Sequence, residues 1–314
     1  MNRVLANGLS VAVLLLAAGR AGAGPTGRIY WTDPSTDKIY RAHLDGSHVG
    51  IAVHATASGQ VDAGPWGLAI DQYAGKIYWT DNGNDKIQRA NVDGSGAENL
   101  ITTGLGIPNG MAVDAGGGKM YWVDNGTDSV SRANLDGTGA ETLLTIPPNS
   151  TLADVDLAVG GGKMYFVDAA TQKIQRANLD GTGVEDLLSG FDSRYITLDV
   201  AAGKMYWTEN TPEKIRRANL DGTSPEDLVT TGLSQVVGIA LDLANGRMYW
   251  ADDGTNKIQR ANLDGSGVED IITGLFSPRE LVITVPEPSG FILAALGLAA
   301  MILFGTRRLG ARII

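Results

Sequence analysis

The sequence predicts an all-β fold, a closed ring of six four-stranded antiparallel blades, that is, a six-bladed β-propeller. Three observations predict this fold. A tyrosine-centred motif, such as IYWTD at residues 77–81, recurs six times at intervals of about 41 to 48 residues, the period of a propeller blade. Each copy is followed by a second alternating segment and an Asp-Gly turn. Between the two ends of the chain, no segment shows a helical period of apolar residues.

Each repeat divides into four short strands. The segment KIYWTD (76–81) alternates apolar and polar residues and follows a glycine turn, and KIQRAN (86–91) alternates again. The turn at Asp93-Gly94 then leads to the aliphatic segment ENLI (98–101), and we expect both central turn residues to have positive φ. The fourth segment, NGMAVD (109–114), has the small apolar residues that suit the crowded centre of a ring. The repeats therefore predict one closed domain over residues 27–285.

The first and last repeats are complementary. The first begins at its YWTD strand, with no small apolar strand before it, whereas the last is followed by an extra strand, PRELVIT (278–284). We expect this terminal strand to complete the first blade, because an unpaired sheet edge is then removed. With roughly 43 residues per blade, the domain is large enough to bury a core without disulfides.

The YWTD motif and the downstream RANLDG resemble the class B repeats of the low-density lipoprotein receptor, a family of six-bladed propellers. The resemblance extends over nearly all of residues 27–285 and implies a non-enzymatic module that binds a protein ligand or a neighbouring domain. The sequence has no cysteine and so departs from the animal members, whose propellers are flanked by disulfide-bonded modules. We therefore do not assign the ligands of the animal members to this protein. Phe166 replaces the tryptophan of the fourth repeat, and Glu209 replaces the aspartate of the fifth.

Three side chains recur once in every repeat, whereas a catalytic site needs one special constellation. We therefore interpret the recurring acidic and arginine residues as structural, pairing with or capping backbone within and between blades. The aromatic residues are expected to fill gaps between sheets. The repeated set is Tyr30, Asp33, Arg41, Tyr78, Asp81, Arg89, Tyr121, Asp124, Arg132, Tyr165, Asp168, Arg176, Tyr206, Glu209, Arg217, Tyr249, Asp252 and Arg260.

The N-terminal segment has the pattern of a secretory signal peptide over residues 1–23. Arg3 precedes an apolar stretch, and the small residues Ala21 and Ala23 form the expected cleavage site. Signal peptidase is therefore an expected partner, and the protein is expected to be exported.

The C-terminal segment, residues 286–314, resembles a bacterial PEP-CTERM sorting tail. Pro286, Glu287 and Pro288 precede an apolar run of about 16 residues, predicted as a transmembrane helix, which Arg307 and Arg308 follow. The resemblance implies cleavage near the Pro-Glu-Pro by an exosortase-type membrane protease, after transient anchoring. A permanent single-pass anchor is the alternative. The protein is thus expected at the cell surface or outside the cell.

The charge of the predicted domain restricts its partners. Residues 1–23 and 286–314 hold five basic residues and one acidic residue, so 20 basic and 34 acidic residues remain, a net charge of −14. Such a surface repels nucleic acid and anionic membranes. An unknown surface protein or extracellular polysaccharide is the expected ligand.

One face of the predicted ring holds the variable parts of the repeat, namely the loops after YWTD and those leading into each innermost strand. Variation on one face of a repeated scaffold is typical of a binding surface. Trp66 lies outside the repeat pattern and either contacts a ligand or plugs the channel mouth. The candidate ligand-binding residues are Trp66, Asn109, Asp154, Arg194, Tyr195, Arg279 and Glu280.

No cofactor is expected. The loops 81–85 and 252–256 are rich in oxygen ligands and leave calcium open, but they lack the EF-hand spacing, and Asx residues also form ordinary turns. The three histidines, His43, His48 and His54, all lie in the first repeat. The alternative to a binding module is a hydrolase or lyase that uses channel carboxylates such as Asp154 and Asp156, and carboxylates converging in the channel would favour it.

Overall fold

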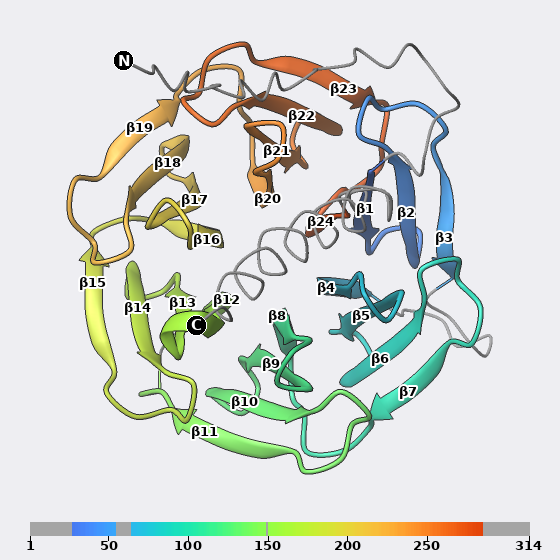
Figure 1. Cartoon of the computed structure of the whole chain (residues 1–314), viewed down its shortest axis with the longest axis vertical. Coiled ribbons are helices and arrows are strands. Elements are labelled where there is room, and N and C mark those ends of the chain that lie inside the picture. Colours follow the sequence, from blue (N-terminus) through green and yellow to red (C-terminus); the bar gives the residue numbers. More distant parts are fainter. Residues whose placement is uncertain (1–26, 55–63, 149, 285–314) are drawn as a thin grey trace, which may run out of the picture. The chain divides into compact units, whose positions relative to one another are not determined.

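Six sheets of four antiparallel strands surround a central channel, which confirms the predicted propeller (Figure 1). The computed structural model describes residues 27–54, 64–148 and 150–284, and Gly27–Val285 forms one compact unit. The predicted signal peptide and sorting tail, with Ala21, Ala23, Pro286–Pro288, Arg307 and Arg308, lie outside the described residues. Among the described residues, no helix has the length and apolar character needed to cross a membrane.

The blades share one order of strands, from the channel outward. The innermost strands are β24 (Leu281–Thr284), β4 (Pro65–Asp71), β8 (Pro108–Asp114), β12 (Leu152–Ala158), β16 (Ser193–Asp199) and β20 (Val236–Asp242). The second strands, which carry the YWTD motif, are β1 (Arg28–Asp33), β5 (Lys76–Asp81), β9 (Lys119–Asp124), β13 (Lys163–Asp168), β17 (Lys204–Asn210) and β21 (Arg247–Asp252).

The outer half of each blade is a hairpin. Its third strands are β2 (Lys38–His43), β6 (Lys86–Asn91), β10 (Ser129–Asn134), β14 (Lys173–Asn178), β18 (Glu213–Asn219) and β22 (Lys257–Asn262). Its outermost strands are β3 (Gly50–His54), β7 (Glu98–Ile101), β11 (Glu141–Thr145), β15 (Glu185–Ser189), β19 (Glu226–Val229) and β23 (Glu269–Thr273). A single 3₁₀ turn, η1 (Val159–Gly161), follows β12 in the described part of the chain.

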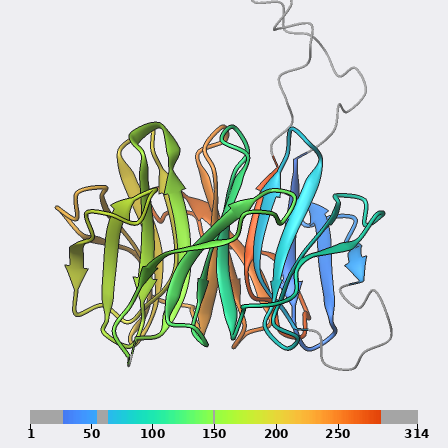
Figure 2. The same cartoon turned by 90° about the horizontal axis from the view of Figure 1, so that it is seen from below.

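The last strand closes the ring, as the sequence indicates. β24 pairs antiparallel with β1, with Arg28 opposite Thr284 and Trp31 opposite Leu281, so the first blade has the order β24-β1-β2-β3. The strands run from one face of the ring to the other (Figure 2). The loops into the innermost strands lie on one face, which we call the mouth face. The Asp-Gly turns lie on the opposite face, which we call the turn face.

The core lies between neighbouring sheets, where the two aromatic residues of each motif point to opposite neighbours because side chains alternate along a strand. Trp79 packs with Ile39 and Val53 of the first blade, whereas Tyr78 packs with Met111 and Met120 of the third. These aromatic side chains are almost fully buried, as the prediction that they fill the gaps between sheets requires.

The Asp-Gly turns differ from the expectation in one respect. The glycine has positive φ, as at Gly94 (91°), but the aspartate before it does not. Each turn is longer than a two-residue hairpin loop, because Asn91 N donates to the Ser95 carbonyl. The Asp93 carboxylate instead accepts from Ser95 N and Oγ at 2.9 and 2.7 Å, and this Asx turn needs no positive φ at the aspartate.

Candidate functional site

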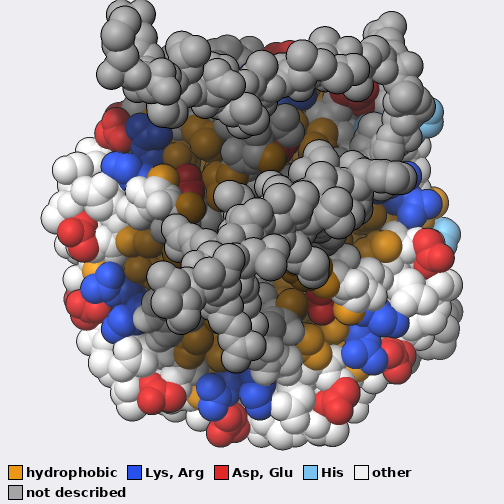
Figure 3. All heavy atoms as spheres, in the orientation of Figure 1, with side chains coloured by type: hydrophobic (Ala, Val, Ile, Leu, Met, Phe, Trp, Pro, Cys, Tyr) orange, Lys and Arg blue, Asp and Glu red, His pale blue; other side chains and the backbone are white. Residues whose placement is uncertain are grey.

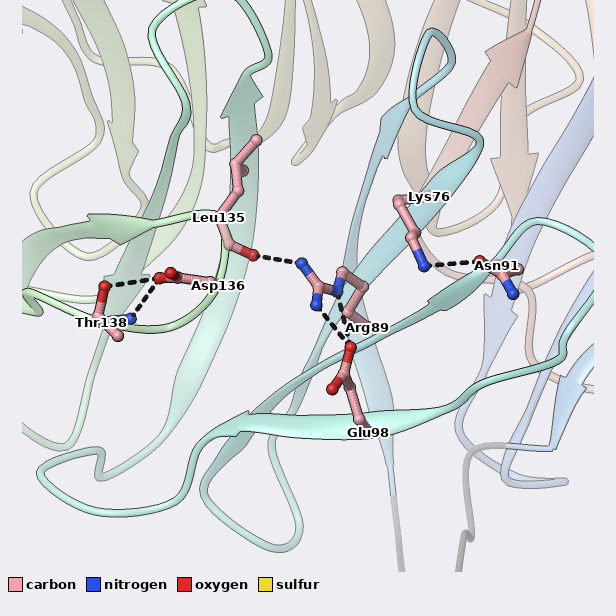
Figure 4. A network of polar contacts seen from close by, with 7 residues as sticks. All are labelled: Lys76, Arg89, Asn91, Glu98, Leu135, Asp136 and Thr138. Carbon is pink, nitrogen blue, oxygen red and sulfur yellow. Dashed lines mark hydrogen bonds and ion pairs between the residues drawn. The ribbon is translucent and has the colours of Figure 1, made fainter.

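The repeated arginines connect each blade to the next. Arg89 donates through Nη1 to the Leu135 carbonyl of the following blade at 2.8 Å and pairs with Glu98 of its own blade (Figure 4). Arg260 donates to the Leu44 carbonyl at 3.1 Å and thereby joins the last blade to the first. The equivalent bonds run from Arg41 to Val92, Arg132 to Leu179, Arg176 to Leu220 and Arg217 to Leu263.

The repeated aspartates hold the loops of the mouth face. Asp124 accepts hydrogen bonds from the amides of Gly106, Ile107, Gly126 and Thr127 at 2.9 to 3.0 Å. It therefore ties the loop after its own strand to the loop leading into β8. Asp33, Asp81, Asp168 and Asp252 make bonds of the same kind. Glu209 departs from them and pairs with Arg216 at 3.4 Å.

The mouth face carries a pocket of about 320 Å³ at the entrance to the channel. One wall is a stack in which the Arg279 guanidinium lies 4.5 Å from the centre of the Trp66 ring, and Arg279 also pairs with Asp253 at 3.3 Å. The pocket, which we call the mouth pocket, is lined by Trp66, Asn109, Thr151, Ala153, Arg194, Tyr195, Asn210, Gln235, Val237 and Arg279.

Several polar groups of the mouth pocket make hydrogen bonds or ion pairs with neighbouring residues. Asn109 bridges blades, because its amide donates to the Leu152 carbonyl and accepts from Asn82, both at 2.9 Å. Arg194 pairs with Asp192 at 3.2 Å. With its amide turned to donate to the Val236 carbonyl at 3.1 Å, Asn210 accepts from Nε of Arg194 at 3.2 Å. Arg194 is thus held at the pocket by two neighbours.

The third position of each innermost segment lies at the border between the mouth pocket and a second cavity of the channel. Three of these positions are glycines that lie against the next blade: a Cβ on Gly110, for example, would lie 2.5 Å from the Cα of Asp154. The other three carry large polar side chains. We call this ring the neck, and its members are Gly67, Gly110, Asp154, Tyr195, Gly238 and Glu280.

A second space, the lower cavity, lies beyond the neck and has a volume of about 240 Å³. Three carboxyl groups, those of Asp154, Asp156 and Glu280, belong to its lining. The other lining residues are Leu68, Ala69, Ile70, Met111, Ala112, Val113, Val155, Ile196, Thr197, Ile239, Ala240, Leu281, Val282 and Ile283. These residues are mostly aliphatic in type, but more of the exposed lining of the cavity is polar than apolar.

Burial perturbs the titration of this cluster. It raises the pKa of Asp156 to about 6 and the pKa values of Asp154 and Glu280 well above their usual range. The charge of Asp154 raises the pKa of Glu280 further. Burial, then the charges of Glu280 and Asp154, also raise the pKa of the Tyr195 phenol. These side chains therefore act on one another across the channel.

All seven candidate ligand-binding residues lie at the channel, but in two groups. Trp66, Asn109, Arg194, Tyr195 and Arg279 line the mouth pocket, whereas Asp154 and Glu280 line the lower cavity. Sequence reasoning missed Thr151, Asn210 and Gln235. Asn210 directly follows the motif of its repeat, as Asn82 and Asn125 do in theirs, and this register would have placed it on the mouth face.

The loops considered for calcium use their carboxylates in turns. Asp81 accepts from Asn84 N at 3.0 Å, and Asp252 accepts from Thr255 N at 2.8 Å. Within residues 27–54, 64–148 and 150–284, no group of three or more His, Asp or Glu side chains is placed to hold a metal ion.

Two segments match a known repeat family. The sequence profile of the low-density lipoprotein receptor repeat class B matches residues 27–71 and 75–115. None of the curated proteins matches the chain.

Solved structures of similar fold come from proteins with different roles. A chain of a nidogen/laminin complex is 21% identical with a TM-score of 0.72, over 83% of this chain and 99% of that one. A putative TolB from Agrobacterium tumefaciens is 13% identical with a TM-score of 0.61, over 81% and 91%. A virginiamycin B lyase from Staphylococcus aureus is 17% identical with a TM-score of 0.60, over 79% and 82%. The chain is thus a six-bladed β-propeller, two segments of which match the low-density lipoprotein receptor class B repeat.

Proposed function

We propose that this protein is an exported, non-enzymatic binding scaffold that holds an extracellular polysaccharide or a surface protein at its mouth pocket. The observation that carries the proposal is the lining of that pocket. It combines the rings of Trp66 and Tyr195, two arginines and several amides, and the residues that supply them differ between most blades. Aromatic faces, guanidinium groups and amides together are suited to sugars or peptides that bear carboxylates.

The arrangement of the fold supports this assignment. The outer part of the ring repeats the same contacts in every blade, so it supplies a rigid frame for the loops of the mouth face. Acidic and basic side chains alternate around the periphery (Figure 3). The mouth pocket instead gathers residues from all six blades, which is how a ring scaffold builds one site from many loops.

The binding test compares two faces of the same protein. The host's extracellular polysaccharide and its surface proteins are titrated separately against wild type, Trp66→Ala and Arg194→Ala. We expect each variant to weaken binding of the true ligand roughly tenfold or more, as loss of an aromatic or arginine hot spot does. Tyr73→Ala removes an aromatic side chain, 79% exposed, from the turn face and is the matched control. Equal binding by all four proteins would exclude the mouth pocket.

A hydrolase or lyase is the second candidate, because carboxylates do converge in the channel. Asp156, with a pKa of about 6, could act as a general acid or base near neutral pH. However, both of its oxygens accept backbone amides, of Leu157 at 2.7 Å and Leu198 at 3.0 Å, and Asp154 accepts from Ile196 N at 3.0 Å. Because the carboxylate oxygens of both residues already accept backbone amides, the two side chains serve to hold β12 against β16. Binding is therefore the better supported function.

The cellular address rests on the two ends of the sequence. We expect signal peptidase to cleave after the Ala21–Ala23 segment and an exosortase-type protease to cleave near Glu287, which leaves a mature protein without residues beyond about 290. Intact mass of the protein from its native host measures both steps, and Glu287→Ala should block the second. Recovery of full-length, membrane-bound protein with Arg307 and Arg308 would instead establish a permanent anchor.

A further inference from the structure

The first blade departs from the repeat at two positions beside its Asp-Gly turn, on the turn face. His43 stands where the other blades have an asparagine, and His48 stands where most of them have a glycine. The two positions face each other in the repeat itself, because a Cβ on Gly96 of the second blade would lie 3.3 Å from the side-chain nitrogen of Asn91. The two departures therefore place one imidazole against another.

His48 has a backbone conformation that disfavours a side chain. Its φ is 59°, in the left-handed region, where Gly96, Gly139, Gly183 and Gly267 of other blades have φ between 64° and 68°. A residue with a Cβ is less stable in this region than glycine. Strain of this kind is concentrated at functional sites, where the surrounding structure maintains it. The turn itself therefore does not account for a histidine at this position.

The contacts of Ser47 determine which nitrogen of each ring carries the hydrogen. Ser47 Oγ donates its one hydrogen to Asp45 Oδ1 at 2.6 Å, so it can only accept from the two histidines. Nδ1 of His48 lies 3.0 Å from this oxygen, and Nδ1 of His43 lies 3.4 Å from it. Each neutral ring therefore carries its hydrogen on Nδ1 and a lone pair on Nε2. Histidines that bind metal ions usually donate from their other ring nitrogen in this way.

The two rings are stacked, with their centres 4.4 Å apart and their planes inclined by 26°. Because both Nδ1 atoms face Ser47, both Nε2 atoms lie on the ring edges turned away from it. His48 is exposed and His43 is partly buried, so an ion from solution has access to the pair. Rotation of the exposed His48 ring can direct the two lone pairs toward one ion.

We propose that His43 and His48 bind a divalent transition-metal ion through their Nε2 atoms, with Cu²⁺ bound most tightly. Imidazole is a preferred ligand of Cu²⁺, Ni²⁺ and Zn²⁺, and Cu²⁺ generally forms the most stable complexes of this series. Among the described residues, no group of three or more His, Asp or Glu side chains is placed for a metal ion, so water completes the coordination. The site lies on the turn face and is independent of the proposed function of the mouth pocket.

Calorimetric titration of the untagged protein with copper(II) sulfate tests the proposal. We expect one saturable site per chain, and electron paramagnetic resonance of the bound Cu²⁺ should show coupling to imidazole nitrogen. Calcium chloride should not compete, because calcium takes oxygen ligands rather than imidazole. A spectrum with oxygen ligands alone, or displacement of Cu²⁺ by calcium, would show that the ion binds to surface carboxylates and would overturn the proposal.

Two variants restore the residue types of the second blade and should therefore leave the fold intact, namely His43→Asn and His48→Gly. Each should weaken Cu²⁺ binding roughly tenfold or more, because loss of even an outer partner of a metal ligand has an effect of this size. His54→Asn is the matched control, since it removes the third histidine, which is exposed on β3 and outside the pair. Undiminished Cu²⁺ binding by His43→Asn combined with His48→Gly would refute the assignment.

Stability distinguishes a metal site from a purely structural ring stack. Without metal, His48→Gly should leave the midpoint of urea unfolding unchanged or raise it, because glycine relieves the left-handed strain. Added Cu²⁺ should raise the midpoint of the wild-type protein but not that of His48→Gly, because a ligand that binds only the folded state stabilises it. A lower midpoint in metal-free His48→Gly, with the same response to Cu²⁺ as wild type, would assign the pair to the turn and overturn the proposal.

Discussion

The outer part of the ring repeats the same contacts in every blade, whereas the residues at the neck of the channel differ from blade to blade. In the outer part, one arginine per blade donates to a carbonyl of the next blade, and the six copies are nearly interchangeable. At the neck, the equivalent positions hold three glycines and three polar side chains, Asp154, Tyr195 and Glu280. The difference teaches that repetition distributes stability around the ring, whereas chemistry concentrates where the repeats diverge. Four predictions test this division.

The largest effect is expected at a neck glycine. In Gly110→Ala, the new Cβ would lie about 2.5 Å from the Cα of Asp154, so the backbones of two blades must move apart. We expect a loss of about 3 kcal/mol or more in the free energy of unfolding, measured by urea denaturation. Gly50→Ala is the control, because nothing lies within 4 Å of its Cβ position. Equal stability of the two variants would mean that the neck is not tightly packed.

The repeated aspartates should come next. Asp124→Ala leaves four amides without their acceptor, at a residue with 0% exposure, and should cost about 2–3 kcal/mol in the free energy of unfolding. The matched control is Asp136→Ala, whose exposed side chain accepts from Thr138 N and Oγ1 at the turn (Figure 4). If Asp124→Ala abolished ligand binding at unchanged stability, the structural role of the repeated aspartates would be wrong.

The acidic neck should give stability a distinctive pH dependence. The pKa of Asp156 rises from about 4 in the unfolded chain to about 6 in the folded protein, so the folded state binds more protons in this window. Stability from this group is therefore complete below about pH 4 and is lost as the pH rises to about 6, a difference of about 3 kcal/mol. Asp156→Asn should remove this dependence of stability on pH, even if the substitution also lowers stability by the same amount at every pH. A parallel pH profile for the two proteins would contradict the shift.

The smallest effect is expected in the outer part. Arg176→Ala loses the bond to the Leu220 carbonyl and the pair with Glu185, and should cost about 1–2 kcal/mol in the free energy of unfolding. Glu185→Ala removes only the exposed ion pair and should cost less than about 0.5 kcal/mol. Arg41 is a natural comparison, because Gly50 stands opposite it where the other blades have a glutamate, while its bond to the Val92 carbonyl is kept. A larger loss in Glu185→Ala than in Arg176→Ala would reverse the assigned importance of the two contacts.

The blades could be predicted from the sequence because every level of the pattern agrees. The alternation in KIYWTD, its spacing and the surplus strand at 278–284 each point to the same ring, and the pairing of Arg28 with Thr284 agrees with them. The Asp-Gly turns were predicted with the wrong backbone, because the dipeptide does not reveal the loop length. That length is set by the bond from Asn91 N to the Ser95 carbonyl.

The channel could be predicted only in outline. The register of the repeats places Trp66 and Glu280 at the centre of the ring, but it does not show that they line two separate cavities. That separation depends on how closely Gly110 approaches Asp154 in the neighbouring blade, a distance between repeats rather than within one. The hydrogen bond from Leu198 N to Asp156 likewise depends on how β12 and β16 lie against each other, which the sequence of a single repeat does not determine.

The pairing of Arg28 with Thr284 has a consequence for display. Both ends of the propeller leave the ring side by side at the turn face, with Arg28 N donating to Oγ1 of Thr284 at 3.2 Å. Any tether that begins at either end therefore pulls on one edge of one blade. A load applied there is borne first by the β1–β24 seam, whereas the mouth pocket lies on the opposite face of the ring.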